Sequence, residues 1–165
     1  MITHIECIPR KTMEDFKDKF LQRDDVAVIS IIDPNMPFIF ERNTHKILQL
    51  KFSDIEPGPF LKHSFICEDM TFMSHGQAMD IVSRINLLAN DDNQWKLMIN
   101  CSAGICRSGA IGQFAQAFST MPDAHFASVN MHIKPNQYVF NKLVEVWFNC
   151  FKHELKVIQE DTLFD

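Results

Sequence analysis

The sequence predicts an α/β fold, with a central, mainly parallel mixed sheet of four to five strands and helices on both sides of it. Residues 26–32 form an almost unbroken β-branched apolar run, which is typical of a strand covered on both faces. Residues 74–88 carry a helix-capping signal followed by apolar residues at helical spacing. Residues 96–109 pass from an apolar strand into an apolar helix. We expect one domain over residues 1–165, with a core at about 3–155 and a frayed tail at 156–165.

The first third of the chain is expected to contribute three strands and one helix. Residues 5–8 should form a short strand, and Thr12 should begin a helix because acids follow its hydroxyl cap. The run at 26–32 ends at an Asp-Pro pair, and alternation over 46–52 predicts a strand that ends before Asp54. The first helix should bury three large apolar residues, Phe16, Phe20 and Leu21.

A long irregular stretch, residues 54–73, separates these strands from the second helix. A connection of this length in a compact domain is usually functional or mobile. Ser74 and Gln77 match a capping box, so a helix should begin there. Its buried side is expected to consist of Ala78, Ile81, Val82, Ile85 and Leu88.

The last third is expected to hold one short strand and three helices. The strand covers 96–100, and the helix after it has a period that brings Ile111, Phe114, Ala115 and Phe118 onto one face. Pro122 ends that helix, a short helical piece follows at 124–131, and Pro135-Asn136 begins a long amphipathic helix. The core stripe of the long helix is expected to be Phe140, Leu143, Val144, Trp147 and Phe151.

Composition limits the function classes. Sixteen basic and 21 acidic residues give a net charge of −5, which argues against broad binding to nucleic acid or anionic membranes. The five Cys are odd in number and irregularly spaced, and the first residues lack the features of a signal peptide. No apolar run approaches the ~18 residues of a membrane span. We therefore expect a cytoplasmic protein.

The chemistry gathers between the strand at 96–100 and the helix after it. Cys101 and Arg107 are six positions apart, and small residues predominate in the loop between them, Ser102-Ala103-Gly104-Ile105-Cys106. Amides of such a loop and the following helix amino end can bind a phosphate dianion, and an Arg guanidinium can bind two of its oxygens. A helix amino end and a nearby cation also favour the thiolate form of Cys101, and Ser108 can donate to that thiolate.

Two other readings of the cysteines are weaker. Cys101 could be an ordinary buried thiol, although its position between strand and helix is the one that nucleophilic chemistry needs. A zinc site is disfavoured because Cys101 and Cys106 lack a second Cys or His pair at suitable spacing. The expected chemistry therefore requires no metal or other cofactor.

Residues 101–108, Cys-Ser-Ala-Gly-Ile-Cys-Arg-Ser, resemble the C-x5-R-[ST] signature of the cysteine-dependent protein tyrosine and dual-specificity phosphatases. The strand at 26–32, the strand that ends before Asp54 and the Pro135-Asn136 pair extend the resemblance, which is to compact bacterial or viral members. The resemblance covers roughly residues 26–151. It implies a mainly parallel sheet between helices and hydrolysis of phosphomonoesters through a phosphocysteine.

Two residues depart from this resemblance. The family usually has His directly before the nucleophile, and this chain has Asn100, which cannot carry a charge. Cys106 lies inside the loop, at a spacing that also occurs in the low-molecular-weight tyrosine phosphatases. That second likeness implies a reversible Cys101–Cys106 disulfide, and hence a redox-sensitive cysteine.

The residue that protonates the leaving group is left open by the sequence. Asp54 is favoured because it ends a strand before a Pro/Gly turn, as the acid of the resembled family does. Asp69 is the second choice because it is nearer to Cys101 in the sequence and precedes the capped helix; Glu56 and Glu68 follow. The His residues without a motif are weak candidates, namely His63, His75, His132 and His153. Phe60 and Phe65 could line a phenyl-phosphate pocket.

The expected function is hydrolysis of phosphorylated protein, on phosphotyrosine first, with phosphoserine and phosphothreonine left open. Cys101, Arg107, Asp54 and Ser108 would carry the catalysis, and residues 102–107 would bind the phosphate. One alternative is a phosphatase-like module that binds phosphopeptides with little turnover. Another is the same chemistry on a phosphoinositide or an RNA 5′-phosphate, which the absence of Lys from the loop and the acidic net charge disfavour.

Overall fold

The computed structural model describes the backbone of residues 1–56 and 70–161 and the side chains of residues 1–56 and 70–150. Its centre is a four-stranded parallel sheet in the order β1-β4-β2-β3. The strands are β1 (Ile2–Pro9), β2 (Val26–Ile32), β3 (Ile47–Lys51) and β4 (Trp95–Cys101). The predicted α/β fold with a mainly parallel sheet is confirmed, and every pairing within the described residues is parallel.

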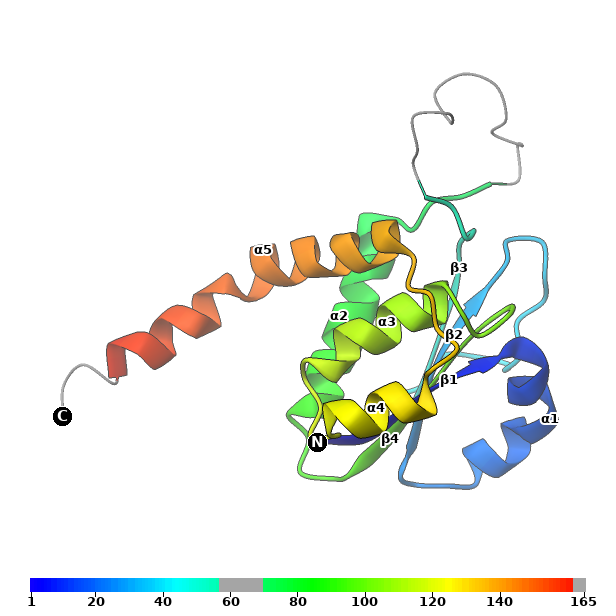
Figure 1. The fold of residues 1–165 in the computed structure, drawn as a ribbon, viewed down its shortest axis with the longest axis horizontal. Coiled ribbons are helices and arrows are strands. Elements are labelled where there is room, and N and C mark those ends of the chain that lie inside the picture. The colour runs from blue at the N-terminus through cyan, green and yellow to red at the C-terminus, as the bar shows by residue number, and fades with distance from the viewer. Residues whose placement is uncertain (57–69, 162–165) are drawn as a thin grey trace, which may run out of the picture.

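Helices cover both faces of the sheet, as predicted (Figure 1). The elements α2 (His75–Ala89), α3 (Arg107–Gln116) and α5 (Gln137–Asp161) pack on one face, and α1 (Arg10–Leu21) packs on the other. The short α4 (Asp123–Val129) lies beside the free edge of β1. Within the described part of the chain, no helix combines the length and apolarity needed to span a bilayer.

Two separate cores result because side chains alternate across the strands. Ile29 and Ile31 of β2 join the core under α2, α3 and α5. Val26 and Val28 of the same strand join a smaller core under α1, together with Met13 of that helix. β2 is buried at all seven positions, as its apolar run predicts.

The predicted beginning of α2 is confirmed. The Ser74 hydroxyl accepts the Gln77 N–H at 3.1 Å, and the Gln77 side chain accepts the Ser74 N–H at 2.8 Å. All five residues that were expected to face the core from α2 are at most 1% exposed.

The prediction for α1 is wrong in its start and in its buried face. The helix begins at Arg10, directly after Pro9 ends β1, rather than at Thr12. Met13 is fully buried, whereas Phe16 and Leu21 are 42% and 50% exposed. At about 100° per residue, Phe20 lies within about 20° of Met13 around the helix, and Phe16 and Leu21 lie about 60° and 80° away. The helix therefore packs on the sheet through Met13, and Phe16 and Leu21 lie at the margins of this contact.

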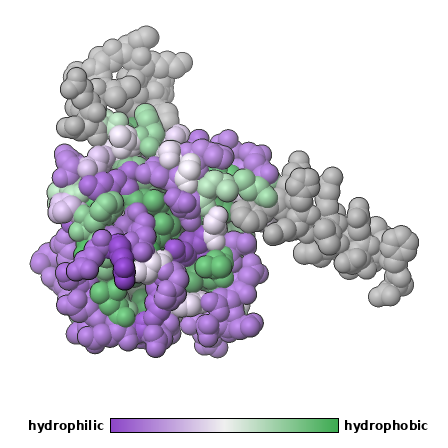
Figure 2. All heavy atoms as spheres, turned by 180° about the vertical axis from the view of Figure 1, so that it is seen from behind, coloured by the Kyte–Doolittle hydropathy of each residue, from purple (hydrophilic) through white to green (hydrophobic). Residues whose placement is uncertain are grey.

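The carboxyl end of α1 borders a cavity of about 560 Å³ rather than solid core. Phe20 and Leu21 line it, together with Val26 at the start of β2 and Ile47 at the start of β3. Figure 2 shows the molecule from behind the view of Figure 1, and there apolar patches interrupt a mostly hydrophilic surface. The cavity lies at the amino ends of its two strands, opposite the loop that follows β4.

The core stripe of α5 is rotated from the predicted one because the helix packs against both α2 and α3. Val139, Leu143 and Val146 are buried, and Val139 and Val146 were not predicted. Phe140, Val144 and Trp147 are only partly buried against this core, and the side chain of Phe151 lies outside the described residues. The α5 backbone continues to Asp161, beyond residue 155, where the core was expected to end.

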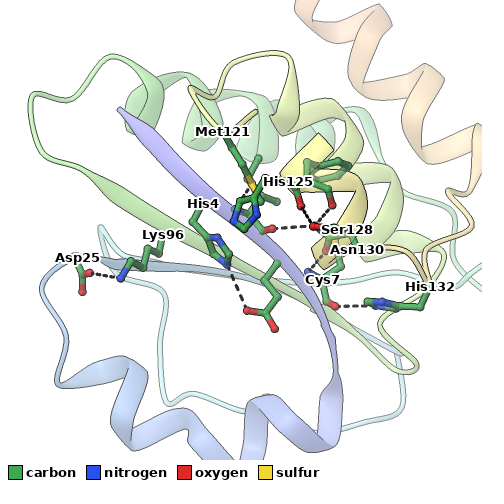
Figure 3. A network of polar contacts seen from close by, with 12 residues as sticks. His4, Cys7, Asp25, Lys96, Met121, His125, Ser128, Asn130 and His132 are labelled. Carbon is green, nitrogen blue, oxygen red and sulfur yellow. Dashed lines mark hydrogen bonds and ion pairs between the residues drawn. The ribbon is translucent and has the colours of Figure 1, made fainter. Parts of the chain in front are cut away.

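The free edge of β1 is closed by side chains from the segment around α4 (Figure 3). Asn130, which is 2% exposed, accepts the Cys7 N–H at 2.7 Å and donates to the Ile5 carbonyl at 2.9 Å. The Met121 sulfur accepts the Ile5 N–H at 3.2 Å, and a ring nitrogen of His132 contacts the Cys7 carbonyl at 2.9 Å. These contacts satisfy backbone groups that a sheet edge would otherwise leave unpaired.

Replacing Asn130 with Ala should lower the free energy of unfolding by about 2–4 kcal/mol, because two buried backbone groups lose their partners. Urea unfolding followed by circular dichroism measures the change. Met131→Ala is the matched control: its side chain is 82% exposed, and we expect a change within about 0.5 kcal/mol. Equal stabilities of the Asn130 variant and the control would contradict the assigned role of Asn130.

Candidate active site

The loop between β4 and α3 has the compact shape that the sequence predicts. Cys101 is the last residue of β4 and Arg107 the first of α3. Gly104 has a φ of +75°, and a Cβ there would lie 2.5 Å from the Ile8 carbonyl carbon. Only glycine fits this left-handed and crowded position. The Ser102 carbonyl accepts the Arg10 N–H at 3.3 Å, which ties the loop to the end of β1.

Cys101 lies at the floor of the loop and is 2% exposed. Its Sγ is 3.2 Å from Oγ of Ser108, in the first turn of α3. The amino end of α3 and this hydroxyl can both stabilise negative charge on the Cys101 sulfur. Cys7 is also buried nearby, and its thiol donates to the Ser108 carbonyl at 3.2 Å. Burial, with smaller contributions from Cys101 and Glu6, raises the pKa of Cys7 to about 12, so Cys7 stays protonated.

Arg107 is buried, and both terminal nitrogens of its guanidinium have partners. Its Nη1 donates to the Phe52 carbonyl at 2.6 Å and lies 2.8 Å from the Asp33 carboxylate. Its Nη2 donates to the Ser102 hydroxyl at 3.1 Å, and its buried Nε has no partner among the described residues. In general, the Nε–Nη2 edge of a guanidinium can bind two oxygens of a phosphate.

Asp33, which sequence reasoning did not single out, anchors this arrangement. The carboxylate accepts a hydrogen bond from Ser102 and pairs with Arg107. Burial opposes its charge, but the Ser102 hydrogen bond and the positive charge of Arg107 outweigh burial and hold the pKa of Asp33 below its ordinary value. The available signal was its place at the carboxyl end of a buried parallel strand, where ligand sites gather.

Asp54, the favoured candidate for the acid, is connected to the loop through Asn136. Asn136 donates from Nδ2 to Asp54 Oδ1 at 2.8 Å, and the Asn136 N–H binds the Cys106 carbonyl at 3.1 Å. Burial raises the pKa of Cys106, and the charge and hydrogen bond of Asp54 raise it further. Asn136 therefore connects Asp54 to the loop.

The other predicted positions lie in the loop, elsewhere among the described residues, or outside them. Residues 102–106 form the loop, and the Ile105 carbonyl accepts the Lys134 N–H at 3.2 Å. Glu56 lies at the amino end of α5, where it accepts the Gln137 N–H at 2.7 Å. Outside the described residues lie Asp69, Glu68, Phe60, Phe65 and His63, as does the side chain of His153. His132 contacts the β1 edge, and His75 begins α2.

The side chain of Asn100 lies on the opposite face of the sheet from that of Cys101. Cys101 and Ile99 belong to the core under α3, so the alternation of β4 directs Asn100 to the α1 face. It is fully buried, pairs in register with Ser30 of β2, and neither of its amide atoms has a partner among the described residues. Cys101 and Cys106 are both free thiols, and a disulfide between them stays a prediction.

Within residues 1–56 and 70–150, no three His, Cys, Asp or Glu side chains are grouped as a metal site. No family model and no curated protein matches the chain. The candidate site therefore stands on its residues and geometry. Three elements that follow parallel strands supply it: Asp33 after β2, Asp54 after β3, and the loop after β4.

The Asp33–Arg107 pair predicts a pH-dependent contribution to stability. Asp33→Asn should lower the free energy of unfolding by about 1–2 kcal/mol at pH 7, since Arg107 is buried and Asp33 is partly exposed. Because folding lowers the pKa of Asp33, the difference should be complete above the ordinary aspartate pKa of about 4 and shrink as the pH falls below it.

Urea unfolding of both proteins between pH 3 and 7 tests this. Asp15→Asn, on the exposed side of α1, is the control and should change stability by less than about 0.5 kcal/mol at every pH. A difference between wild type and Asp33→Asn that does not change over this range would contradict the assignment.

Proposed function

We propose that the protein is a phosphomonoester hydrolase that acts through a phosphocysteine intermediate. Its proposed substrates are phosphorylated proteins that carry phosphotyrosine, and phosphoserine and phosphothreonine stay open. One observation carries the proposal. The buried Arg107 follows the loop that has Cys101 at its floor; both terminal nitrogens of its guanidinium are held, and among the described residues its Nε has no partner. A guanidinium that is fixed in place and keeps an N–H without a protein acceptor is suited to bind an oxyanion.

In the first chemical step, the Cys101 thiolate attacks phosphorus and an S–P bond forms. The P–O bond to the leaving group breaks, and Asp54 gives its proton to that oxygen. Loop amides and Arg107 would bind the phosphoryl oxygens, whose charge grows in the transition state. Asn136 supports this role because it binds both the Asp54 carboxylate and the Cys106 carbonyl, which keeps the carboxyl group near the loop.

In the second step, water attacks the phosphocysteine and the S–P bond breaks. Asp54, now a carboxylate, accepts the proton of the water, and inorganic phosphate leaves. The sulfur departs as a thiolate, and the Ser108 hydroxyl at 3.2 Å can donate to it. The two steps consume only the phosphomonoester and water.

The charge of the chain supports a phosphoprotein over a polyanionic substrate. The loop has no Lys, and Asp33 and Asp54 lie beside it, which would oppose the additional phosphates of an inositol headgroup or an RNA backbone. The acidic net charge acts in the same direction.

Hydrolysis of 4-nitrophenyl phosphate in the presence of a chelator tests the nucleophile and the cation. Cys101→Ser should abolish turnover, since a serine hydroxyl is not ionised at neutral pH. Arg107→Lys should lower kcat about 100-fold or more because Lys cannot present two aligned donors. If both variants keep the wild-type activity, the proposal is wrong. Tight phosphopeptide binding by wild type without a phosphoenzyme burst would instead indicate a binding module.

The role of Asp54 predicts a dependence on the leaving group. Asp54→Asn should lower kcat about 100-fold or more with phenyl phosphate, whose leaving group needs a proton. With 4-nitrophenyl phosphate, which leaves readily as an anion, the loss should be much smaller. Asp69→Asn is the comparison. If that variant shows the leaving-group dependence and Asp54→Asn does not, Asp69 is the acid.

A further inference from the structure

The amino end of α5 holds two acidic side chains of residues 52–56, which follow β3. Asn136 donates to the Asp54 carboxylate at 2.8 Å, and the next residue, Gln137, donates its N–H to Glu56 Oε1 at 2.7 Å. Between them, Ile55 is 9% exposed and its carbonyl lies 3.4 Å from Asn136 Nδ2. The segment is therefore attached to α5 at both ends.

The attachment of Glu56 uses a donor that the helix cannot satisfy itself. Asn136 caps α5, with its Oδ1 accepting the Val139 N–H at 3.0 Å, so the Gln137 N–H is among the first free donors of the helix. A carboxylate at this position is also favoured by the helix dipole. Glu56 therefore completes the amino end of α5 while it fixes the segment that contains Asp54.

We propose that Glu56 is a positioning residue that holds Asp54 over the loop through the amino end of α5. The inference rests on the proposed function, in which Asp54 is the proton donor. Glu56 is exposed, and one of its oxygens is occupied by the Gln137 N–H rather than directed at the loop. This assigns Glu56 a role different from that of the acid, for which the sequence had left it as a candidate.

The first test compares two substrates. Glu56→Ala should lower kcat with phenyl phosphate by about 2- to 5-fold and leave kcat with 4-nitrophenyl phosphate nearly unchanged. Glu56→Gln keeps an oxygen that can accept the Gln137 N–H, so it should retain most of the wild-type rate. Adding Glu56→Ala to Asp54→Asn should cost nothing further, since the residue that Glu56 positions is already lost. Glu145→Ala, an exposed glutamate on α5, is the control and should match wild type.

The second test needs no turnover. In a Cys101→Ser background, the pH dependence of Cys106 alkylation by iodoacetamide reports on the groups around Cys106, which are Asp54 and Arg107. Because Asp54 raises the pKa of Cys106, Asp54→Asn should shift the midpoint to lower pH. Glu56→Ala should shift it in the same direction by a smaller amount. Glu56→Gln should not, although it removes the same charge.

The outcomes separate the two proposals. If the alkylation midpoints shift as expected but the wild-type protein has no phosphatase activity, the positioning role is kept and the proposed function is rejected. Active wild type with equal losses on both substrates for Glu56→Ala, or none, would overturn the positioning role alone. So would Glu56→Gln behaving like Glu56→Ala in either test. If Glu56→Gln loses as much activity as Glu56→Ala in the kinetic test, and Asp54→Asn shows the same leaving-group dependence as wild type, Glu56 is the proton donor. Thermal unfolding of each variant verifies that it is folded.

Discussion

The pairing of the buried Arg107 guanidinium is the constraint on which the site depends. A buried cation needs partners from its surroundings, because its desolvation is otherwise uncompensated. Its partners come from three elements: the Phe52 carbonyl after β3, the Asp33 carboxylate after β2, and the Ser102 hydroxyl of the loop. These contacts fix the guanidinium relative to the sheet, so its Nε–H, which has no partner among the described residues, has a defined direction.

The parallel sheet is what makes this pairing possible. In a parallel sheet every strand delivers its carboxyl end to the same edge, and the polar residues that follow the strands meet there. Here Asp33, Asp54 and Cys101 come from three such ends. β1 is an edge strand of the sheet, and the side chains of Asn130 and Met121 bind the backbone groups on its outer edge.

The amino end of α5 is a second organising feature. Asn136 caps the helix, binds Asp54 and binds the backbone of Cys106, so one residue connects a helix end, an acid and the loop. The contact between Asn136 and Asp54 joins residues 82 positions apart in the sequence, and no local sequence pattern encodes such a contact. The Pro-Asn pair predicted a helix start, and only the fold gave that start a place beside the loop.

Local patterns by themselves determined the strands, most helix starts and the place of the loop between a strand and a helix. The apolar run of β2, the Ser74 capping box and the Cys101–Arg107 spacing each depend on neighbours in the chain, and all three appear in the structure as predicted. The tertiary structure decided which face of α1 is buried, because packing selects Met13 over Phe16 and Leu21. It also decided the partners of Arg107 and Asp54, because a contact between distant segments depends on sheet order and helix placement, which periodicity does not specify.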